Sequence, residues 1–449
     1  IDALADLGVR FTDAHTSSAV CTPTRYSILT GRYNWRSWLK RSVLSGVAPP
    51  LLESDRLTVP RMMQDVGYST YCIGKWHLGL GWEVNEGESF SREDELEKTL
   101  DRTEDYLRVD YHKPVTTGPN DFGFDYSYII PASLDIPPYV YLENGKCTGI
   151  PTEDNKLGVD NEYLMRRGLA VSGMKAENVL PNFTDKVEEV IRAQNKDKPF
   201  YIYFPLTAPH TPIVPTDEFK GTTDIGLYGD FCSQIDSIVG RIVKAVKEQG
   251  LEEDTLIVFT SDNGSSPAAD LDGLREKGHL ANGQWRGHKA DLYEGGHRVP
   301  YIMKWPNGIP AGDDCKQTIC TTDLMATLAD VTGTQLPKDA GEDSFNLMPM
   351  LNGDKHSSRE ATIHHSVEGA FAIRKGPWKF LESAGSGGWS YPTSADLALM
   401  DSPKYQLYNL NDDPAEKNNL FETQPEKSEE LLRLLYQYRD EGRSVSLMN

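Results

Sequence analysis

The chain has 449 residues, of which 38% are apolar, and its formal net charge at pH 7 is −21. This length and composition are sufficient for large cores and two or three domains' worth of chain, and no run of residues predicts a transmembrane segment. The acidic balance argues against binding of nucleic acid or attraction to anionic membranes, so an anionic substrate would require a local cluster of cations.

The first predicted element that carries chemistry is a helix over Thr24–Thr30, which Gly31 ends. Cys21 stands just before this helix, where unpaired backbone N–H groups and the positive end of the helix dipole favour an anion. Arg25 adds a guanidinium group whose shape suits tetrahedral oxyanions. The stretch therefore predicts an anion-binding thiol; the alternative is a buried cysteine at an ordinary helix start.

Three predicted strands in the middle of the chain each lead into polar residues that are capable of chemistry. They span Tyr68–Ile73, Phe200–Phe204 and Thr255–Thr260, and a helix is predicted over Tyr228–Gln249. Strands that alternate with helices imply a mostly parallel sheet, in which ligands bind beyond the carboxyl ends of the strands. The residues expected at that edge are Lys75, His77, His210, Asp262 and Asn263.

A glycine-punctuated basic loop over residues 285–298 leads into a further apolar run, Tyr301–Met303. We expect Lys289 to be the contribution of this loop to the same pocket. Taken singly, each of these segments also fits an ordinary turn or a solvated loop. Their joint occurrence favours a single pocket.

A polar stretch, Asn352–Glu360, is expected to separate a catalytic domain (residues 1–351) from a smaller C-terminal domain (residues 352–449). The predicted fold class is α/β, with a large, mostly parallel sheet flanked by helices and a C-terminal α+β domain that bears an antiparallel sheet. The elements expected in the C-terminal domain are three strands, Ala361–Ile373, Trp378–Leu381 and Tyr405–Leu410, and a closing helix over Lys427–Asp440.

The six cysteines do not predict a complete disulfide framework. If Cys21 takes part in chemistry rather than in a disulfide, five cysteines remain, and five cannot all pair within one chain. Cys72 and Cys232 are expected to be buried free thiols. Cys315 and Cys320 could close a small loop or remain free, because spacing alone does not fix the geometry of a disulfide.

The order of these motifs resembles that of the type I sulfatases of the alkaline-phosphatase-like superfamily. Residues 21–25 look like the C-x-P-S/T-x-R signature in which the cysteine is converted to formylglycine, and GKWHLG, the APH turn, SDNGS, RGHK and EGG-x-R follow in the family order. The resemblance covers nearly all of residues 1–350. It implies an alkaline-phosphatase-like fold and hydrolysis of a sulfate ester.

The resemblance also implies a role for each matching residue. In a sulfatase, the hydrated aldehyde offers one hydroxyl that attacks sulfur and a second whose deprotonation expels sulfate, so hydrolysis is split into two easier steps. Calcium, bound by oxygen ligands, is the divalent cation expected beside it. The implied roles are formylglycine for Cys21, sulfate binding for Arg25, Lys75 and Lys289, the base for His77, the proton donor for His210 with Lys289 as second choice, and metal binding for Cys21, Asp262 and Asn263.

One departure from the family pattern concerns the start of the chain. Sulfatases usually begin with an apolar strand that ends in an Asp-Asp pair and supplies two more metal ligands, and no such strand precedes Cys21. We therefore expect the first few dozen residues of the protein to lie outside the printed sequence. Asp2 and Asp6 are expected on the solvated face of a helix and are not substitutes.

Two loops of the chain bear on the identity of the substrate. Phe122–Tyr128 and Leu134–Tyr139 resemble loops of bacterial sulfatases that act on sulfated polysaccharides such as algal galactans or glycosaminoglycans; packing of long surface loops is the alternative. The resemblance implies exo action on oligosaccharides, a formylglycine-generating or anaerobic maturation enzyme as partner, and a periplasmic or secreted location. The competing functions are a phosphate or phosphonate monoester hydrolase of the same superfamily and a non-catalytic glycan-binding relative. The expected sugar contacts are His112, Asp135, His297 and Arg298.

Overall fold

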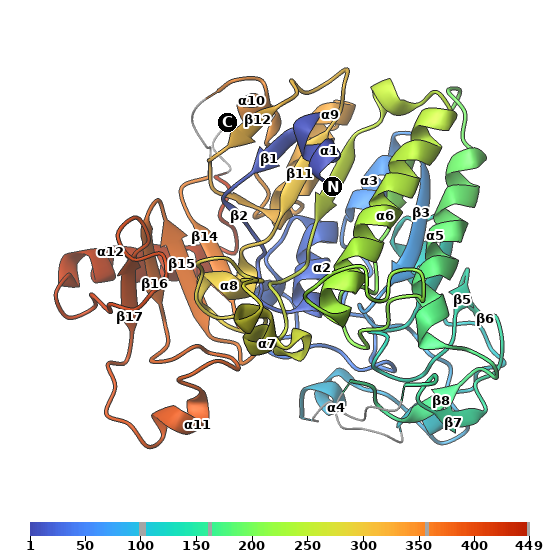
Figure 1. Cartoon of the computed structure of the whole chain (residues 1–449), viewed down its shortest axis with the longest axis horizontal. Coiled ribbons are helices and arrows are strands. Elements are labelled where there is room, and N and C mark those ends of the chain that lie inside the picture. Colours follow the sequence, from blue (N-terminus) through green and yellow to red (C-terminus); the bar gives the residue numbers. More distant parts are fainter. Residues whose placement is uncertain (98–104, 160–163, 355–358, 447–449) are drawn as a thin grey trace. The chain divides into compact units, whose positions relative to one another are not determined.

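The computed structural model describes residues 1–97, 105–159, 164–354 and 359–446 (Figure 1). The chain forms two compact units. The first unit holds residues 44–255 together with Ile1, and the second holds residues 2–43 and 256–449. The predicted domain boundary at residue 351 falls inside the second unit and stays a prediction.

The first unit is built on a five-stranded sheet with the strand order β6-β5-β4-β3-β9. Its central strand β3 is parallel to both neighbours, β4 and β9, whereas the short strands β5 and β6 are antiparallel. The parallel arrangement predicted for strands 68–73 and 200–204 is therefore confirmed. The strand bounds are β3 (Ser69–Lys75), β4 (Tyr126–Ile130), β5 (Leu142–Glu143), β6 (Lys146–Cys147) and β9 (Phe200–Tyr203).

Helices cover this sheet because their apolar side chains recur every three or four residues. Val179, Phe183, Val187 and Ile191 of one long helix are buried in a core that includes Ile73 of β3. The predicted helix over residues 228–249 is confirmed, one residue earlier at each end. The helices of this unit are α3 (Val59–Asp65), α4 (Arg92–Glu97), α5 (Ala176–Arg192) and α6 (Leu227–Glu248), and a separate ribbon pairs β7 (Glu153–Asn155) with β8 (Gly168–Ala170).

The second unit contains a four-stranded sheet with the order β10-β11-β1-β12. Strand β11 is antiparallel to both of its neighbours, so this sheet is mixed. The predicted strand at 255–260 is confirmed as β10 (Ile257–Thr260), and the apolar run at 301–303 forms β11 (Tyr301–Lys304). The other elements of this part are α1 (Asp2–Asp6), β1 (Val9–Phe11), β2 (Ala14–His15), α2 (Cys21–Thr30), α7 (Leu271–Glu276), α8 (Glu294–His297), β12 (Asp313–Cys315), β13 (Ile319–Cys320), α9 (Leu324–Thr332) and α10 (Met348–Leu351).

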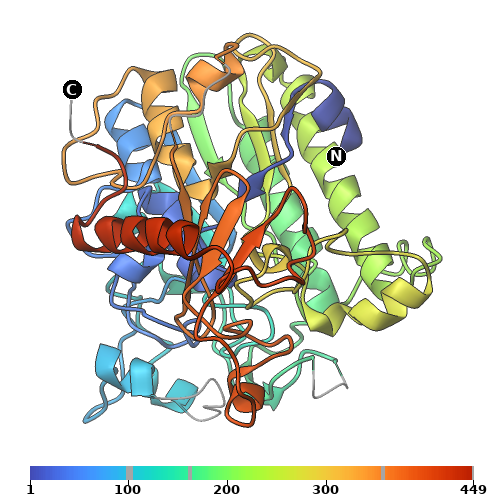
Figure 2. The ribbon, with the colours of Figure 1, turned by 90° about the vertical axis from the view of Figure 1, so that its left-hand side faces the viewer.

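The second unit also contains the predicted antiparallel sheet, in the order β14-β15-β16-β17. Residues 361–373 form two strands because the chain reverses at Gly369, whose φ of +90° suits glycine. The closing helix lies against this sheet (Figures 1 and 2). Its leucines Leu431 and Leu435 are buried in the core that it shares with the sheet. The bounds are β14 (Thr362–His365), β15 (Phe371–Lys375), β16 (Trp378–Leu381), α11 (Ser394–Leu397), β17 (Gln406–Asn409) and α12 (Pro425–Asp440).

None of the six cysteines, all of which lie in described parts of the chain, forms a disulfide, so Cys315 and Cys320 do not close a loop. Cys72 is buried as predicted, whereas Cys232 is only half-buried. Among the described residues, no helix has the length and apolar character needed to cross a membrane.

Candidate active site

Cys21 is the first residue of α2, which begins three residues earlier than the predicted helix over Thr24–Thr30 and so includes Cys21 in its first turn. Every residue of α2 is buried, and the Cys21 residue itself is only 2% exposed. Val20, in an extended conformation, provides no side-chain cap, and Gly31 ends the helix at a φ of +61°. The thiol therefore lies inside the protein at the positive end of a helix dipole.

An ion pair connects α2 to the loop that follows β10. The Nε and Nη2 atoms of Arg25 lie 2.9 and 2.7 Å from Oδ2 of Asp262. The two side chains are only 7% and 21% exposed, so solvent screens this pair little. Arg25 thereby holds Asp262 near the first turn of α2.

Asn263, which follows Asp262, presents an oxygen atom that suits a metal ion. Its amide nitrogen donates to the carbonyl of Gly264, while its Oδ1 is buried and has no hydrogen-bond partner among the described residues. A buried amide oxygen without a donor is costly unless another ligand satisfies it. Carboxylate and amide oxygens are the ligands that calcium prefers, so Asp262 and Asn263 fit a hard divalent cation.

Backbone hydrogen bonds bring the Lys289 turn to the same region. The N–H of Lys289 donates to the carbonyl of Ser265 at 2.9 Å, and the N–H of Ala290 donates to the carbonyl of Ala19 at 2.8 Å. The turn is thus attached on one side to the segment after Asn263 and on the other to the segment before Cys21. The second unit therefore brings together five of the predicted site residues: Cys21, Arg25, Asp262, Asn263 and Lys289.

The paired glycines of the EGG-x-R motif have a steric role beside this cluster. Gly264 donates its N–H to the carbonyl of Gly296 at 2.9 Å. A Cβ atom added at Gly264 would lie 1.7 Å from the carbonyl oxygen of Gly295, well inside the closest approach of real side chains. The turn that carries Asp262 and Asn263 and the loop that precedes β11 therefore pack backbone against backbone.

The first unit links Lys75 and His210 through a serine that the sequence analysis did not single out. Lys75, the last residue of β3, donates from Nζ to Oγ of Ser133 at 3.1 Å, and Ser133 Oγ lies 3.2 Å from Nδ1 of His210. Ser133 follows the end of β4, the parallel neighbour of β3. Ligands bind beyond the carboxyl ends of parallel strands, so the position of Ser133 after β4 also marks it as a candidate site residue. It was not predicted because the loop after β4 contains no recognisable motif.

His210 has a defined tautomer in this arrangement. Its Nδ1 lies 2.9 Å from the carbonyl oxygen of Thr211, which only accepts, so Nδ1 carries the proton and Nε2 is the basic nitrogen. Oδ1 of Asp135 lies 3.7 Å from the same Nδ1, and Oδ2 of Asp135 binds Arg166 at 2.6 Å. These contacts fix the orientation of the imidazole ring.

His77 is completely buried and has a φ of +58°, a backbone conformation that few residues other than glycine adopt. Its Nε2 lies 2.9 Å from the carbonyl oxygen of Leu44, so Nε2 carries the proton and Nδ1 is the basic nitrogen. His112, in contrast, lies on an exposed turn of the same unit.

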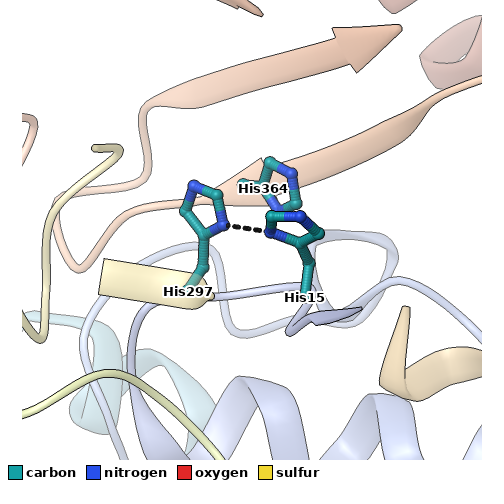
Figure 3. Close-up of side chains that lie close together, drawn as sticks. All are labelled: His15, His297 and His364. Carbon is teal, nitrogen blue, oxygen red and sulfur yellow. Dashed lines mark hydrogen bonds between the residues drawn. The ribbon is translucent and has the colours of Figure 1, made fainter. Parts of the chain in front are cut away.

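His297 and Arg298, which were expected to be sugar contacts, belong to a buried charged network in the second unit. Nδ1 of His297 lies 3.0 Å from Nδ1 of His15 (Figure 3), whose Nε2 lies 2.9 Å from Asp13. Burial lowers the pKa values of His15, His297 and His364, so these rings are neutral at neutral pH. The charged members are the carboxylates of Asp13, Glu294 and Glu416 and the cations of Arg298, Arg374 and Lys379.

The geometry of the three histidines does not suit a metal centre. The rings of His297 and His364 are stacked, with centroids 3.7 Å apart and planes 6° from parallel. An imidazole binds a metal in the plane of its ring, so two rings stacked face to face cannot both ligate one ion. Three carboxylates already balance three cations. The network is therefore a structural element.

The burial of this network corrects two predicted sugar contacts. His297 is completely buried, and the Arg298 side chain is 11% exposed and paired with Asp13 and Glu294. A carbohydrate cannot lie against an imidazole that has no exposed surface. Neither residue is carried forward as a sugar contact.

An α/β fold in which a cysteine at a buried helix start lies near an arginine, a lysine and two side chains with oxygen atoms is an arrangement suited to binding an anionic ester. Residues 1–334 match the family described as sulfatase. N-acetylgalactosamine-6-O-sulfatase of Bacteroides thetaiotaomicron is 31% identical over 97% of this chain and 87% of that protein. Arylsulfatase A of Homo sapiens is 30% identical over 97% of this chain and 81% of that protein.

The solved structures include a similar chain from Bacteroides thetaiotaomicron, determined in work on the metabolism of multiple glycosaminoglycans. It superimposes with a TM-score of 0.82 at 29% identity and covers 98% of this chain and 93% of its own. The chain described here belongs to the sulfatase family. It is a sulfuric ester hydrolase, which confirms the resemblance drawn from its motifs.

Proposed function

We propose that this protein removes sulfate from a sulfated carbohydrate, acting from the end of oligosaccharides derived from a sulfated polysaccharide. The observation that carries the proposal is the cluster of Cys21, Arg25, Asp262, Asn263 and Lys289 in the second unit. The names of its relatives support the carbohydrate part, because one is an N-acetylgalactosamine-6-O-sulfatase. A periplasmic or secreted location is proposed on the same ground.

Cys21 is the residue that we propose to be converted to formylglycine by a maturation enzyme, of either the formylglycine-generating or the anaerobic kind. The hydrated aldehyde supplies a hydroxyl nucleophile that a thiol does not. Arg25 and Lys289 hold the sulfuryl oxygens, since fixed cations in a water-poor site stabilise an anionic transition state strongly. Arg25 also positions Asp262 through their ion pair.

Residue 21, Asp262 and Asn263 are the proposed holders of one calcium ion. The ion supplies a positive charge beside the nucleophile and thereby favours its ionised form. The buried Oδ1 of Asn263, which lacks a hydrogen-bond partner among the described residues, is the main support for this assignment.

His210, His77 and Lys75 are the proposed residues of the first unit. His210 is the proton donor to the leaving sugar oxygen and must bind a proton at Nε2 to act; Lys289 is the second choice. His77 is the base for sulfate release, through Nδ1, and Lys75 holds a sulfate oxygen. Ser133 positions Lys75 and His210 relative to each other. His112 and Asp135 remain the proposed sugar contacts of this unit.

The test combines a mass measurement with an activity comparison. Protein made with a maturation enzyme is digested with trypsin, and the peptide of residues 11–25 is weighed; conversion of the thiol to the aldehyde lowers its mass by about 18 Da. Sulfate release is then measured on N-acetylgalactosamine 6-sulfate and on a matching phosphate monoester. We expect a converted peptide and a preference for the sulfate ester.

The controls separate the nucleophile from other thiols. Cys21→Ala should abolish sulfate release, while Cys147→Ala, which removes a half-buried thiol of the first unit, should leave it unchanged. An unconverted Cys21 in active protein would refute the formylglycine mechanism. A preference for the phosphate ester would favour the phosphomonoesterase alternative, and binding without turnover of either ester would favour the non-catalytic one.

A further inference from the structure

A cavity of about 550 Å³ lies in the second unit, at the end of α2 opposite to Cys21. Arg32 lines it just after Gly31 ends the helix, and Trp35 and Arg36 line it from the 3₁₀ turn η1 (Asn34–Arg36). Ten helical residues separate the two ends of α2 by about 15 Å. The cavity is therefore distinct from the cluster around Cys21.

The lining of this cavity is basic, although the chain as a whole is acidic. Arg32, Arg36, Lys40 and Arg439 line it, and Asp440 is the single acidic residue among the described lining residues. In a chain with a net charge of −21, these four cations present N–H donors to one cavity, an arrangement that suits an anion, although carboxylates outside the lining pair with three of them.

Carboxylates that do not line the cavity hold all three of these guanidinium groups, and Nε of Arg32 lies 3.3 Å from Oε1 of Glu342. Both Oδ atoms of Asp343 accept from Arg36, at 2.8 and 2.9 Å, and Glu382 accepts from Arg439 at 2.8 Å. Burial lowers the pKa of His365, which also lines the cavity, to about 3, and the charges of Lys40 and Arg439 act in the same direction. A held guanidinium loses little entropy when a ligand binds.

Aromatic rings form the apolar part of the lining. Trp35 and Phe371 both line the cavity, the guanidinium of Arg36 lies 4.1 Å from the Trp35 ring, and that of Arg439 lies 4.5 Å from the Phe371 ring. Trp35 is 7% exposed, and its indole Nε1 is buried without a hydrogen-bond partner among the described residues. A buried N–H group in that condition is a donor that awaits an acceptor.

We propose that this cavity binds an anionic sugar residue, a hexose that carries a sulfate or carboxylate group. The arginines and Lys40 neutralise the anion, the Trp35 indole donates to it, and the aromatic rings pack against the sugar. The volume lies within the range of small-molecule sites and accommodates one or two sugar rings. The choice of an anionic glycan rests on the proposed function, because a polymer with repeated anionic groups can occupy this cavity and the catalytic cluster independently.

The experiment counts binding sites by calorimetry in a chain that cannot turn over its substrate. In the Cys21→Ala background, a sulfated chondroitin tetrasaccharide should bind at two sites, one at the catalytic cluster and one at the cavity. Trp35→Phe, which removes the indole donor but keeps an aromatic ring, should weaken the second site about tenfold or more. The double change Lys40→Ala with Arg439→Ala should abolish it and reduce the salt dependence of binding.

Matched controls exclude a general loss of charge or fold. Arg433→Ala removes the same charge from an exposed position of α12, the helix that carries Arg439, and should leave both sites intact. Each variant should keep the melting temperature of its parent within a few degrees. With Cys21 restored, the cavity variants should hydrolyse a monosaccharide sulfate at the parent rate.

Three outcomes would overturn the inference. One is a single binding site in the Cys21→Ala parent, and another is equal affinity of that parent and the Trp35→Phe variant. The third is saturation of the cavity by inorganic sulfate with no further affinity from the tetrasaccharide, since that result excludes the sugar. Failure of the proposed function is distinguishable: sulfate release is then absent, while the cavity still binds the tetrasaccharide.

Discussion

Lys379 is the residue whose removal tests the buried network most directly. Its side chain has no exposed surface, and its Nζ lies 3.1 Å from Oε1 of Glu294 and 2.9 Å from Oε1 of Glu416. Lys379→Met keeps the length of the side chain and removes its charge. Two buried carboxyl groups then face each other without their common cation, and Glu416 stays protonated as a result. Breaking a buried ion pair from one side typically costs about 3–5 kcal/mol, and we expect a loss of that size at pH 8.

The loss should depend on pH in a direction fixed by Glu416. Burial raises the pKa of Glu416 to about 7, above its ordinary value of 4.5. A carboxyl group with a raised pKa in the folded state contributes stability at low pH that is lost as the pH rises toward that pKa. In the parent, the free energy of unfolding stops falling near pH 7. In the variant, Glu416 stays protonated, so the free energy of unfolding continues to fall above pH 7. Between pH 6 and pH 8 the variant should therefore lose about 1.4 kcal/mol more than the parent.

Urea unfolding of parent and variant at pH 6 and pH 8 measures both quantities. The compensating variant, Lys379→Met with Glu416→Gln, leaves two carboxylates and two cations in the network and should regain most of the lost stability. The reasoning is refuted if Lys379→Met costs less than about 1 kcal/mol, or if the double variant is no more stable than the single one.

Three further predictions concern the buried histidines, the calcium site and the Lys75–Ser133–His210 hydrogen bonds of the first unit. Because burial holds the imidazole pKa values of the network below 6.5, the free energy of unfolding should fall as the pH drops below 6.5, by about 1.4 kcal/mol per pH unit for each imidazole. Glu416, whose pKa is raised, acts in the opposite direction and cancels one such contribution. Melting temperatures at pH 7 and pH 5 check this, and equal values would contradict it. Calcium should raise the melting temperature of the parent but not of Asn263→Ala, whereas Asn263→Asp should keep the response. Ser133→Ala should lower kcat about tenfold with little change in KM and should shift the pH profile of kcat, whereas an unchanged profile would assign Ser133 a purely structural role.

The parts of the fold that sequence alone predicted are those in which local pattern and burial agree. The strand at 200–204 and the helix at 228–249 are examples, because uninterrupted apolar runs and a 3.6-residue periodicity each have one simple structural solution. The run at 361–373 was read as one strand region, whereas it forms a hairpin that turns at Gly369. The mixed direction of the sheet around β11 was not foreseen either, since periodicity carries no information on strand direction.

The candidate site was predictable where residues stand in short motifs. Cys21 and Arg25 belong to one helix turn, and Asp262 and Asn263 to one strand end, so their proximity follows from local structure. Ser133 was missed because a serine in a proline-rich loop has no motif around it. His297 was misassigned because its partners His15 and His364 come from distant parts of the chain, and only the folded chain shows that it is buried.

The backbone contact between Gly264 and Gly295 constrains how this site can vary over evolution. A single methyl group at position 264 would have to displace either the turn that carries the metal-ligand candidates or the loop that continues into β11. Neither segment can drift alone, so substitutions in one are coupled to adjustments in the other. Specificity for a new sugar is therefore expected to evolve through side chains elsewhere around the site. The backbone contact between Gly264 and Gly295 is expected to stay unchanged.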